Sequence, residues 1–175
     1  VQNIDLIIDA FNAIQNKYNV KLHLVGDGSE RVYLQKKVDA MKLSNKVIFY
    51  GQVSLDEVVK YYNDVDLCIL ALSNKTPTGV TIPGKLPSYM ASGRPIIASL
   101  NGEGANIIKK ANCGFVSKAD DLPELISNLD MMLSLREEER KKLGDSGREF
   151  FSKNFSETTF INKLITTLKK VTEDN

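Results

Sequence analysis

The 175-residue sequence contains few of the residues on which metal sites, disulfide frameworks and histidine-based catalysis depend. Its two cysteines, Cys68 and Cys113, fall in different predicted elements and lack metal-ligand spacing, so neither a disulfide framework nor a metal site is expected. The one histidine, His23, lies in the middle of a predicted strand, where a packed side chain is commoner than a catalytic one. No nucleophile elbow is present, so hydrolase chemistry has no support.

Strong charge of one sign and long apolar runs are also missing. The net charge is +1, which gives no basic stripe for nucleic acid. No apolar run approaches the roughly 20 residues that a membrane-spanning helix needs. The length and the 42% hydrophobic content fit one domain, residues 1–175, with a sizeable core. The sequence opens on a helical pattern without methionine or signal peptide, so we expect a fragment of a longer protein.

Five short apolar segments alternate with helical patterns, and no hairpin signal separates them. We predict strands over residues 21–26, 46–51, 66–72, 94–100 and 114–118. We predict helices over residues 3–18, 29–41, 54–63, 84–93, 136–152 and 156–171. We also predict a loop and helix over residues 101–111, and a helix that begins at Asp120 or Asp121 and reaches Leu133. This alternation indicates a Rossmann-like three-layer α/β/α domain with a parallel sheet. The opening helix lacks a preceding strand, which we expect upstream of Val1.

Several residues are predicted to begin or end these helices. Ser29 is expected to cap the second helix, and Ser54 with Glu57 has the spacing of a capping box. Gly93 is expected to end the helix that contains Lys85. Gly114 is expected to be the C-cap of the helix that ends near Ala111.

Ligands of open α/β sheets bind beyond the carboxyl ends of the strands, and the loops there carry the candidate residues. After the first strand, Gly26 and Gly28 allow close backbone approach and Arg31 adds a positive charge. A tight turn with a solvated arginine is an equally open alternative. After the second strand come Gln52 and Val53, for which a simple capped turn is the alternative.

The stretch TIPGKLPS, residues 81–88, combines features that a phosphate requires. Pro87 is tolerated only in the first turn, so the helix begins no earlier than about Gly84. Lys85 then lies among free backbone N–H groups at the positive end of the helix dipole, with Ser88 on the same face. The alternative is a proline-initiated helix with an exposed lysine. In the next loop, Glu103 is either a partner for a sugar hydroxyl or a solvated side chain.

Taken in order, the segments KLHLVGDGSERVYLQ, NKVIFYGQVSLDEVVKYYNDVDLCILAL and TIPGKLPSYMASGRPIIASLNGEGANIIKKANCGFV resemble the C-terminal, donor-binding domain of family 4 GT-B glycosyltransferases. The similarity runs from about Gln2 to at least Phe155, nearly the whole chain. The TIPGK segment is most similar to the subgroup that builds bacterial cell-surface polysaccharides from UDP-linked sugars. The resemblance therefore implies the C-terminal half of a GT-B glycosyltransferase.

The resemblance also implies a role for each candidate residue. Gly26, Gly28 and Arg31 would lie beside the nucleotide, and the backbone of Gln52 and Val53 would hold the uracil. The residues implied at the diphosphate, the ribose and the donor sugar are Thr81, Pro83, Gly84 and Lys85, then Ser88, then Glu103 and Gly104.

The sequence departs from the family pattern at three positions. Many members carry two glutamates eight residues apart, where this chain has Val80 and Ser88. Many also have a lysine where this chain has Gln2. We therefore expect Lys85 to supply the compensating positive charge, and Ser88 to make a weaker hydrogen bond to ribose than a carboxylate would.

The implied reaction is transfer of a sugar, with retention, from a UDP-sugar to a hydroxyl group. No metal and no cofactor beyond the nucleotide sugar are expected. The expected partners are the UDP-sugar, an acceptor saccharide that is lipid-linked in the resembled subgroup, and the protein's own N-terminal acceptor domain. We expect a cytoplasmic protein, either soluble or peripheral on the inner face of the membrane. The basic residues of the last helix, Lys163, Lys169 and Lys170, would face the membrane in the second case, and a solvated helix face is the commoner alternative.

Three other functions remain open. A non-catalytic nucleotide-binding module would explain the departures from the glutamate pattern. A nucleotide-sugar epimerase would need further acid–base groups, and this chain has one histidine. A flavodoxin-like receiver would need an acidic cluster at the strand ends, which Asp27 alone does not make.

Overall fold

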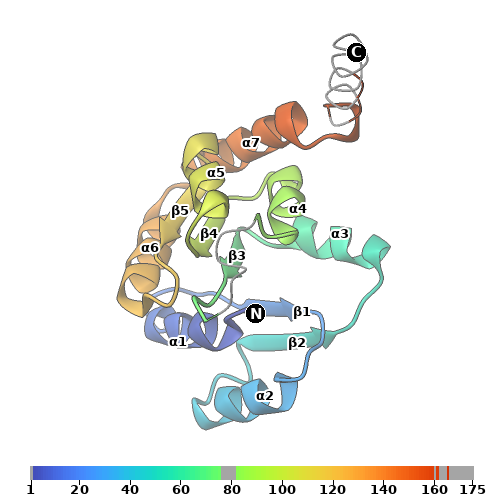
Figure 1. The fold of residues 1–175 in the computed structure, drawn as a ribbon. Coiled ribbons are helices and arrows are strands. Elements are labelled where there is room, and N and C mark those ends of the chain that lie inside the picture. Colours follow the sequence, from blue (N-terminus) through green and yellow to red (C-terminus); the bar gives the residue numbers. More distant parts are fainter. Residues whose placement is uncertain (1, 76–81, 160, 162–164, 166–175) are drawn as a thin grey trace.

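The computed structural model describes residues 2–75, 82–159, 161 and 165 (Figure 1). The strands are β1 (Leu22–Val25), β2 (Val47–Gly51), β3 (Cys68–Ala71), β4 (Ile96–Ser99) and β5 (Gly114–Ser117). The helices are α1 (Ile4–Ile14), α2 (Arg31–Ala40), α3 (Leu55–Asp64), α4 (Lys85–Ser92), α5 (Glu103–Ala111), α6 (Leu122–Ser134) and α7 (Glu137–Asn154). The helix predicted over 156–171 lies largely outside the described residues.

Every strand pair is parallel, which confirms the predicted fold class. Hydrogen bonding divides the strands into two sheets, in the orders β1-β2 and β3-β4-β5, where the sequence had predicted one. In the larger sheet, Ile97 of β4 lies opposite Ile69 on one side and Phe115 on the other. Figure 1 shows β1, and not β2, on the side of the smaller sheet that lies toward β3.

The larger sheet is covered by helices on both faces, because its central strand alternates between two apolar clusters. Ile96 and Ala98 pack with residues of α4 and α5, whereas Ile97 packs with residues of α1 and α6. These three side chains are fully buried. Burial of each isoleucine contributes roughly 1.5–3 kcal/mol to folding, so two-sided coverage stabilises the three-layer arrangement.

The smaller sheet packs α1 and α2 against one face, where Leu22 and Val47 are buried. An aromatic group forms elsewhere on its surface: the His23 ring stacks on Tyr50, and Tyr61 of α3 meets Tyr50 edge-on with ring centroids 4.6 Å apart. The Tyr50 hydroxyl lies 2.9 Å from His23 Nδ1. His23 therefore has the packed role that the sequence predicts.

Two predicted helix boundaries are confirmed. Ser54 Oγ accepts the Glu57 backbone N–H while the Glu57 carboxylate accepts the Ser54 N–H, so the capping box forms. Gly93 ends α4 in the left-handed conformation, at φ 69°.

Two other boundaries are wrong. Ser29 does not cap α2, because the helix begins at Arg31 and its N-cap is Glu30. Gly114 is not the C-cap of α5; Asn112 takes the left-handed position, at φ 48°. Gly114 instead opens β5, where a Cβ atom would lie 1.7 Å from the Ile96 carbonyl oxygen.

Arginine side chains close the carboxyl ends of two helices. Arg94 donates hydrogen bonds to the carbonyls of Tyr62 and Asn63 at the end of α3. Arg148 of α7 donates to the carbonyls of Ala91 and Ser92 at the end of α4. The positive charges satisfy free carbonyls at the negative end of each helix dipole.

Close contact between α7 and the end of α4 depends on a glycine, which gives a first test. A Cβ atom on Gly144 would lie 2.0 Å from the Gly93 carbonyl oxygen. Gly144→Ala is therefore expected to lower the free energy of unfolding by about 2 kcal/mol, measured by urea denaturation. The control Lys141→Ala, at an exposed position of the same helix, should change it by less than about 0.5 kcal/mol. Equal stability of the two variants would contradict this packing.

Candidate functional site

Most candidate residues lie in two groups at the carboxyl ends of the strands. The first group surrounds the ends of β1 and β2 and contains Gly26, Gly28, Arg31, Gln52 and Val53. The second surrounds the starts of α4 and α5 and contains Pro83, Gly84, Lys85, Ser88, Glu103 and Gly104. Among the described residues, no hydrogen bond or ion pair joins one group to the other. Thr81 and Val80 lie outside the described residues.

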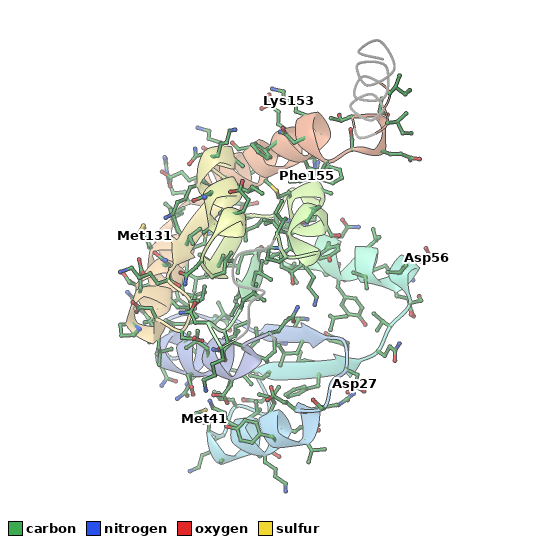
Figure 2. The ribbon with its side chains drawn as sticks, in the orientation of Figure 1. Asp27, Met41, Asp56, Met131, Lys153 and Phe155 are labelled. Carbon is green, nitrogen blue, oxygen red and sulfur yellow. The ribbon has the colours of Figure 1, made fainter. Side chains whose placement is uncertain are left out.

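In the first group, Asp27 organises the turn between β1 and α2 (Figure 2). Its carboxylate accepts the Gly28 backbone N–H at 2.8 Å and Arg31 Nη1 at 3.1 Å. The Gly28 N–H and, to a lesser degree, Arg31 lower the pKa of the Asp27 carboxyl below its ordinary value. Asp27 thus already shows that the donors of this turn bind an oxygen anion.

Gly51 brings the ends of the two strands together. The Gly26 N–H donates to the Gly51 carbonyl at 2.8 Å, and Gly51 has φ 75°. A Cβ atom at Gly51 would lie 2.9 Å from Arg31 Nη1, so the guanidinium passes directly over this glycine. The arginine is consequently held at the tip of the smaller sheet.

The backbone just after Gly51 has N–H groups that, among the described residues, are free to bind a ligand. The N–H groups of Gln52 and Val53 have no hydrogen-bond partner in the described part of the chain. Gln52 is exposed and Val53 is half-buried. This geometry is compatible with the uracil-binding role that the sequence predicts for their backbone.

In the second group, the starts of α4 and α5 are packed together. A Cβ atom at Gly104 would lie 2.8 Å from Pro83 Cδ, so the two segments touch where each helix begins. Gly102 precedes α5 at φ 75°, and Glu103 and Gly104 lie in the first helical turn, not in a loop. The Glu103 carboxylate accepts a hydrogen bond from Asn106 in its own helix.

Lys85 is the first residue of α4, and Gly84 is its N-cap, as predicted. The Lys85 side chain is exposed and, among the described residues, makes no ion pair or hydrogen bond. Desolvation by the surrounding protein nevertheless lowers the pKa of its ammonium group. Ser88 is exposed on the same helix, three residues further on. An unpaired cation that protein atoms partly desolvate is suited to an anionic ligand.

The helix starts fall into two classes. α1, α3 and α6 begin with side-chain caps from Asn3, Ser54 and Asp121. α2, α4 and α5 have no side-chain cap. Each of these three helices begins in a loop that the sequence assigns to the donor, whereas α7, which also has no side-chain cap, begins elsewhere. The Arg31 N–H of α2 and the Leu86 N–H of α4 donate to the Gly28 and Pro83 carbonyls. The other N–H groups of these first turns that have no partner in the described residues are available to an anion.

The sequence did not single out one polar cluster at the ends of β3, β4 and β5. It contains Asn3, Ser73, Asn74, Asn101 and Asp120, which are joined by hydrogen bonds. A signal was present, because asparagine or aspartate follows each of these three strands within three residues.

Neither a metal centre nor a membrane span is found in the described residues. No group of three or more histidine, cysteine, aspartate or glutamate side chains lies close enough there to hold a metal ion. No described helix has both the length and the apolar character needed to cross a bilayer.

Residues 1–134 match the family described as Glycosyl transferases group 1. The chain belongs to this glycosyltransferase family. Its 175 residues are 26% identical to N-acetyl-alpha-D-glucosaminyl L-malate synthase of Bacillus anthracis, over 44% of that protein. This glycosyltransferase chain spans less than half the length of each curated relative that it matches.

Two solved structures show the same fold. The structure of Anabaena Alr3699/HepE in complex with UDP matches with a TM-score of 0.82 and 20% identity, over 97% of this chain and 45% of that one. The C-terminal domain of LpcC, a group 1 family protein of Francisella tularensis, matches with a TM-score of 0.75 and 20% identity, over 89% of this chain and 80% of that one. These neighbours support the Rossmann-like half of a GT-B fold.

Two glycines of the second group provide a matched test of its packing. Gly104→Ala is expected to lower the free energy of unfolding by about 2 kcal/mol, because the new methyl group meets both Pro83 and Leu100 at 2.8 Å. Gly84→Ala should change it by less than about 0.5 kcal/mol, because no atom lies within 4 Å of the new Cβ. Thermal and urea denaturation of both variants measure the difference. A Gly104→Ala protein as stable as Gly84→Ala would refute the contact between the two helix starts.

Proposed function

We propose that this chain is the donor-binding domain of a retaining glycosyltransferase. The whole protein would transfer a sugar from a UDP-sugar to a hydroxyl group of an acceptor saccharide. The observation that carries the proposal is the set of three helix starts without a side-chain cap, α2, α4 and α5, together with the ammonium group of Lys85, which has no partner among the described residues.

These groups match the chemistry of the leaving diphosphate. Negative charge grows on the diphosphate as the bond to the sugar breaks. Backbone N–H groups and a lysine that are already fixed in place stabilise this charge without reorganising. We propose no step through a metal or through a cofactor other than the nucleotide sugar. Asp27 supports the role of the first group, because its carboxylate uses the Gly28 N–H and Arg31 as a phosphate would.

The identity of the donor is proposed from two supports. The TIPGK segment resembles the subgroup that uses UDP-sugars, and a structural neighbour was solved in complex with UDP. The exposed Ser88 hydroxyl would bind the ribose, and Glu103 and Gly104 would face the donor sugar.

The proposed setting is synthesis of a bacterial capsule, O-antigen or exopolysaccharide. The acceptor there is lipid-linked and the enzyme works at the cytoplasmic face of the membrane.

The proposal also accounts for the division into two sheets. Among the described strands, β1 pairs only with β2, and β3 pairs only with β4. A right-handed crossover through α1 into β1 would place a preceding parallel strand beside β1, on the side toward β3. We propose that a strand upstream of Val1 joins the two sheets there. An N-terminal domain further upstream would supply the acceptor site.

The experiment that tests the donor is calorimetric titration of the full-length protein with UDP, ADP and GDP. UDP is expected to bind selectively. Lys85→Ala should weaken UDP binding by more than about 1 kcal/mol, or roughly fivefold, because it removes a charge-assisted hydrogen bond to the diphosphate. The matched control is Lys110→Ala, which removes an exposed lysine from the opposite end of α5.

Equal UDP affinity of the two lysine variants would refute the role of Lys85. Equal or absent binding of all three nucleotides would instead favour a non-catalytic module over a UDP-sugar transferase. Turnover of a nucleotide sugar by the full-length protein separates these two readings.

Lys85 is expected to favour UDP binding but, while its ammonium group is charged, to reduce the stability of the fold. Because the folded chain lowers the pKa of Lys85, the charged ammonium is disfavoured relative to the unfolded state. The wild-type chain should therefore gain stability as the pH rises from the lowered pKa toward the ordinary value of 10.5, and Lys85→Ala should lack this gain. Thermal denaturation between pH 7 and pH 10.5 measures it. At pH 7, a variant that melts well below the wild type would show that Lys85 is a structural residue.

A further inference from the structure

Asp120 receives hydrogen bonds from two distant segments of the chain. It lies between β5 and α6 in the left-handed conformation, at φ 63°. Its Oδ1 accepts Asn3 Nδ2 at 2.8 Å, and its Oδ2 accepts the Asn74 backbone N–H at 2.9 Å and Ser73 Oγ at 3.3 Å. The donors come from the start of α1 and the exit of β3, and all three are neutral.

A second set of hydrogen bonds extends this cluster to the exit of β4. Asn101 Nδ2 donates to Asn74 Oδ1 at 2.7 Å, and Asn101 Oδ1 accepts the Ala119 N–H at 3.2 Å. Asn74 Nδ2 donates to the Ala119 carbonyl at 3.3 Å. The exits of three adjacent strands are thus fixed to one another by side chains as well as by the sheet.

One of these exits leads directly to the second group of site residues. The chain runs from Asn101 through Gly102 into α5. The start of α5 in turn packs against Pro83, which precedes α4, at Gly104. The cluster therefore holds the start of α5 directly and the start of α4 through this contact.

We infer that Asp120 is a positioning residue for the donor, acting through Asn74 and Asn101 on the start of α5 and, through the contact of Gly104 with Pro83, on the start of α4. This inference rests on the proposed function. Asp120 accepts bonds as a carboxylate, so each is stronger than a bond between neutral groups. Loss of this anchor would misplace the start of α5, and with it the start of α4, by a small distance, and such misplacement lowers binding and turnover steeply.

Two substitutions at Asp120 separate its side chain from its backbone. Asp120→Gly keeps the left-handed conformation at no steric cost and removes both acceptor oxygens. Asp120→Asn tolerates the same conformation and keeps one acceptor. In the full-length enzyme, Asp120→Gly is expected to raise the KM for the UDP-sugar by roughly tenfold, with a smaller change in kcat. Asp120→Asn should restore part of the loss.

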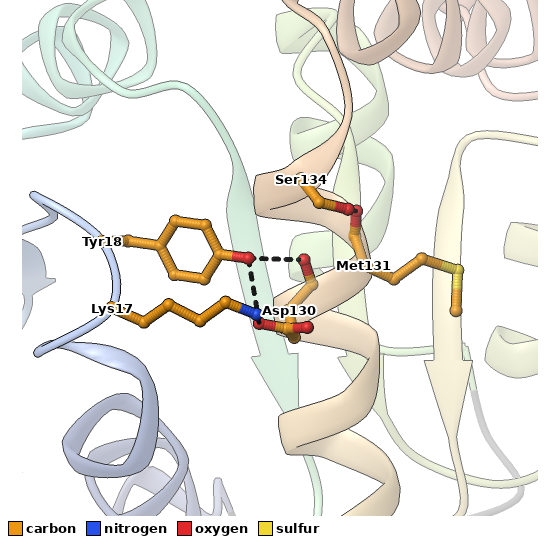
Figure 3. Close-up of polar contacts among 5 residues, drawn as sticks. All are labelled: Lys17, Tyr18, Asp130, Met131 and Ser134. Atoms are coloured by element: carbon orange, nitrogen blue, oxygen red, sulfur yellow. Dashed lines mark hydrogen bonds and ion pairs between the residues drawn. The ribbon is translucent and has the colours of Figure 1, made fainter.

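The chain offers a matched control at the other end of α6. Asp130 also accepts several bonds that join α6 to the end of α1, from Lys17 Nζ at 2.5 Å and from the Tyr18 hydroxyl at 2.9 Å (Figure 3). Asp130→Ala should lower thermal stability yet leave the KM for the donor within about twofold of the wild type, because its partners Lys17 and Tyr18 lie outside both groups of site residues.

Kinetics are measured well below the melting temperature of every variant, and Lys85→Ala is assayed in parallel. A raised KM for Asp120→Gly beside an unchanged KM for Asp130→Ala would support the inference. If Lys85→Ala raises the KM but Asp120→Gly behaves like Asp130→Ala, Asp120 only stabilises the fold and the inference is overturned. If Lys85→Ala also leaves the KM unchanged, the proposed donor site itself fails, and the inference fails with it.

Discussion

Burial of β4 on both faces is the constraint on which the rest of the structure depends. Ile96, Ile97 and Ala98 are fully buried, and β3 and β5 occupy both edges of the strand. Such a strand offers solvent neither side chains nor backbone, so helices must cover both of its faces. Backbone that is free to bind a ligand then remains only beyond the strand ends. The helix starts there determine what the domain can bind.

The charges at the helix ends are divided between structure and ligand. Arg94 and Arg148 satisfy carbonyls at the ends of α3 and α4, and Arg31 is paired with Asp27. Lys85, at the start of α4, has no such partner in the described residues. One helix therefore has an arginine that closes its negative end and a lysine that reinforces its positive end. The first interaction is satisfied within the protein, and the second requires an anion.

The sequence predicted the features that depend on neighbouring residues. Parallel strands follow from apolar runs separated by helical patterns, and the Ser54 capping box joins residues only three positions apart. The failures have local causes too. Ser29 has good capping chemistry, but the Arg31 N–H bonds to the Gly28 carbonyl, and this turn starts α2 later. Gly114 was assigned to a helix end because glycine is common there, whereas its real constraint is the close approach of the Ile96 backbone.

The polar cluster could not be predicted in the same way, because its partners are distant in sequence. Asp120 and Asn3 are 117 positions apart, and Asp120 and Asn74 are 46 apart. Asn74, Asn101 and Asp120 are ordinary polar residues after a strand, and Asn3 is an ordinary helix cap, until the order β3-β4-β5 places the three exits side by side. A rule nevertheless follows from the parallel arrangement. Polar residues just after adjacent buried strands share one sheet edge, so they should be considered together, as one network, once the strand order is known.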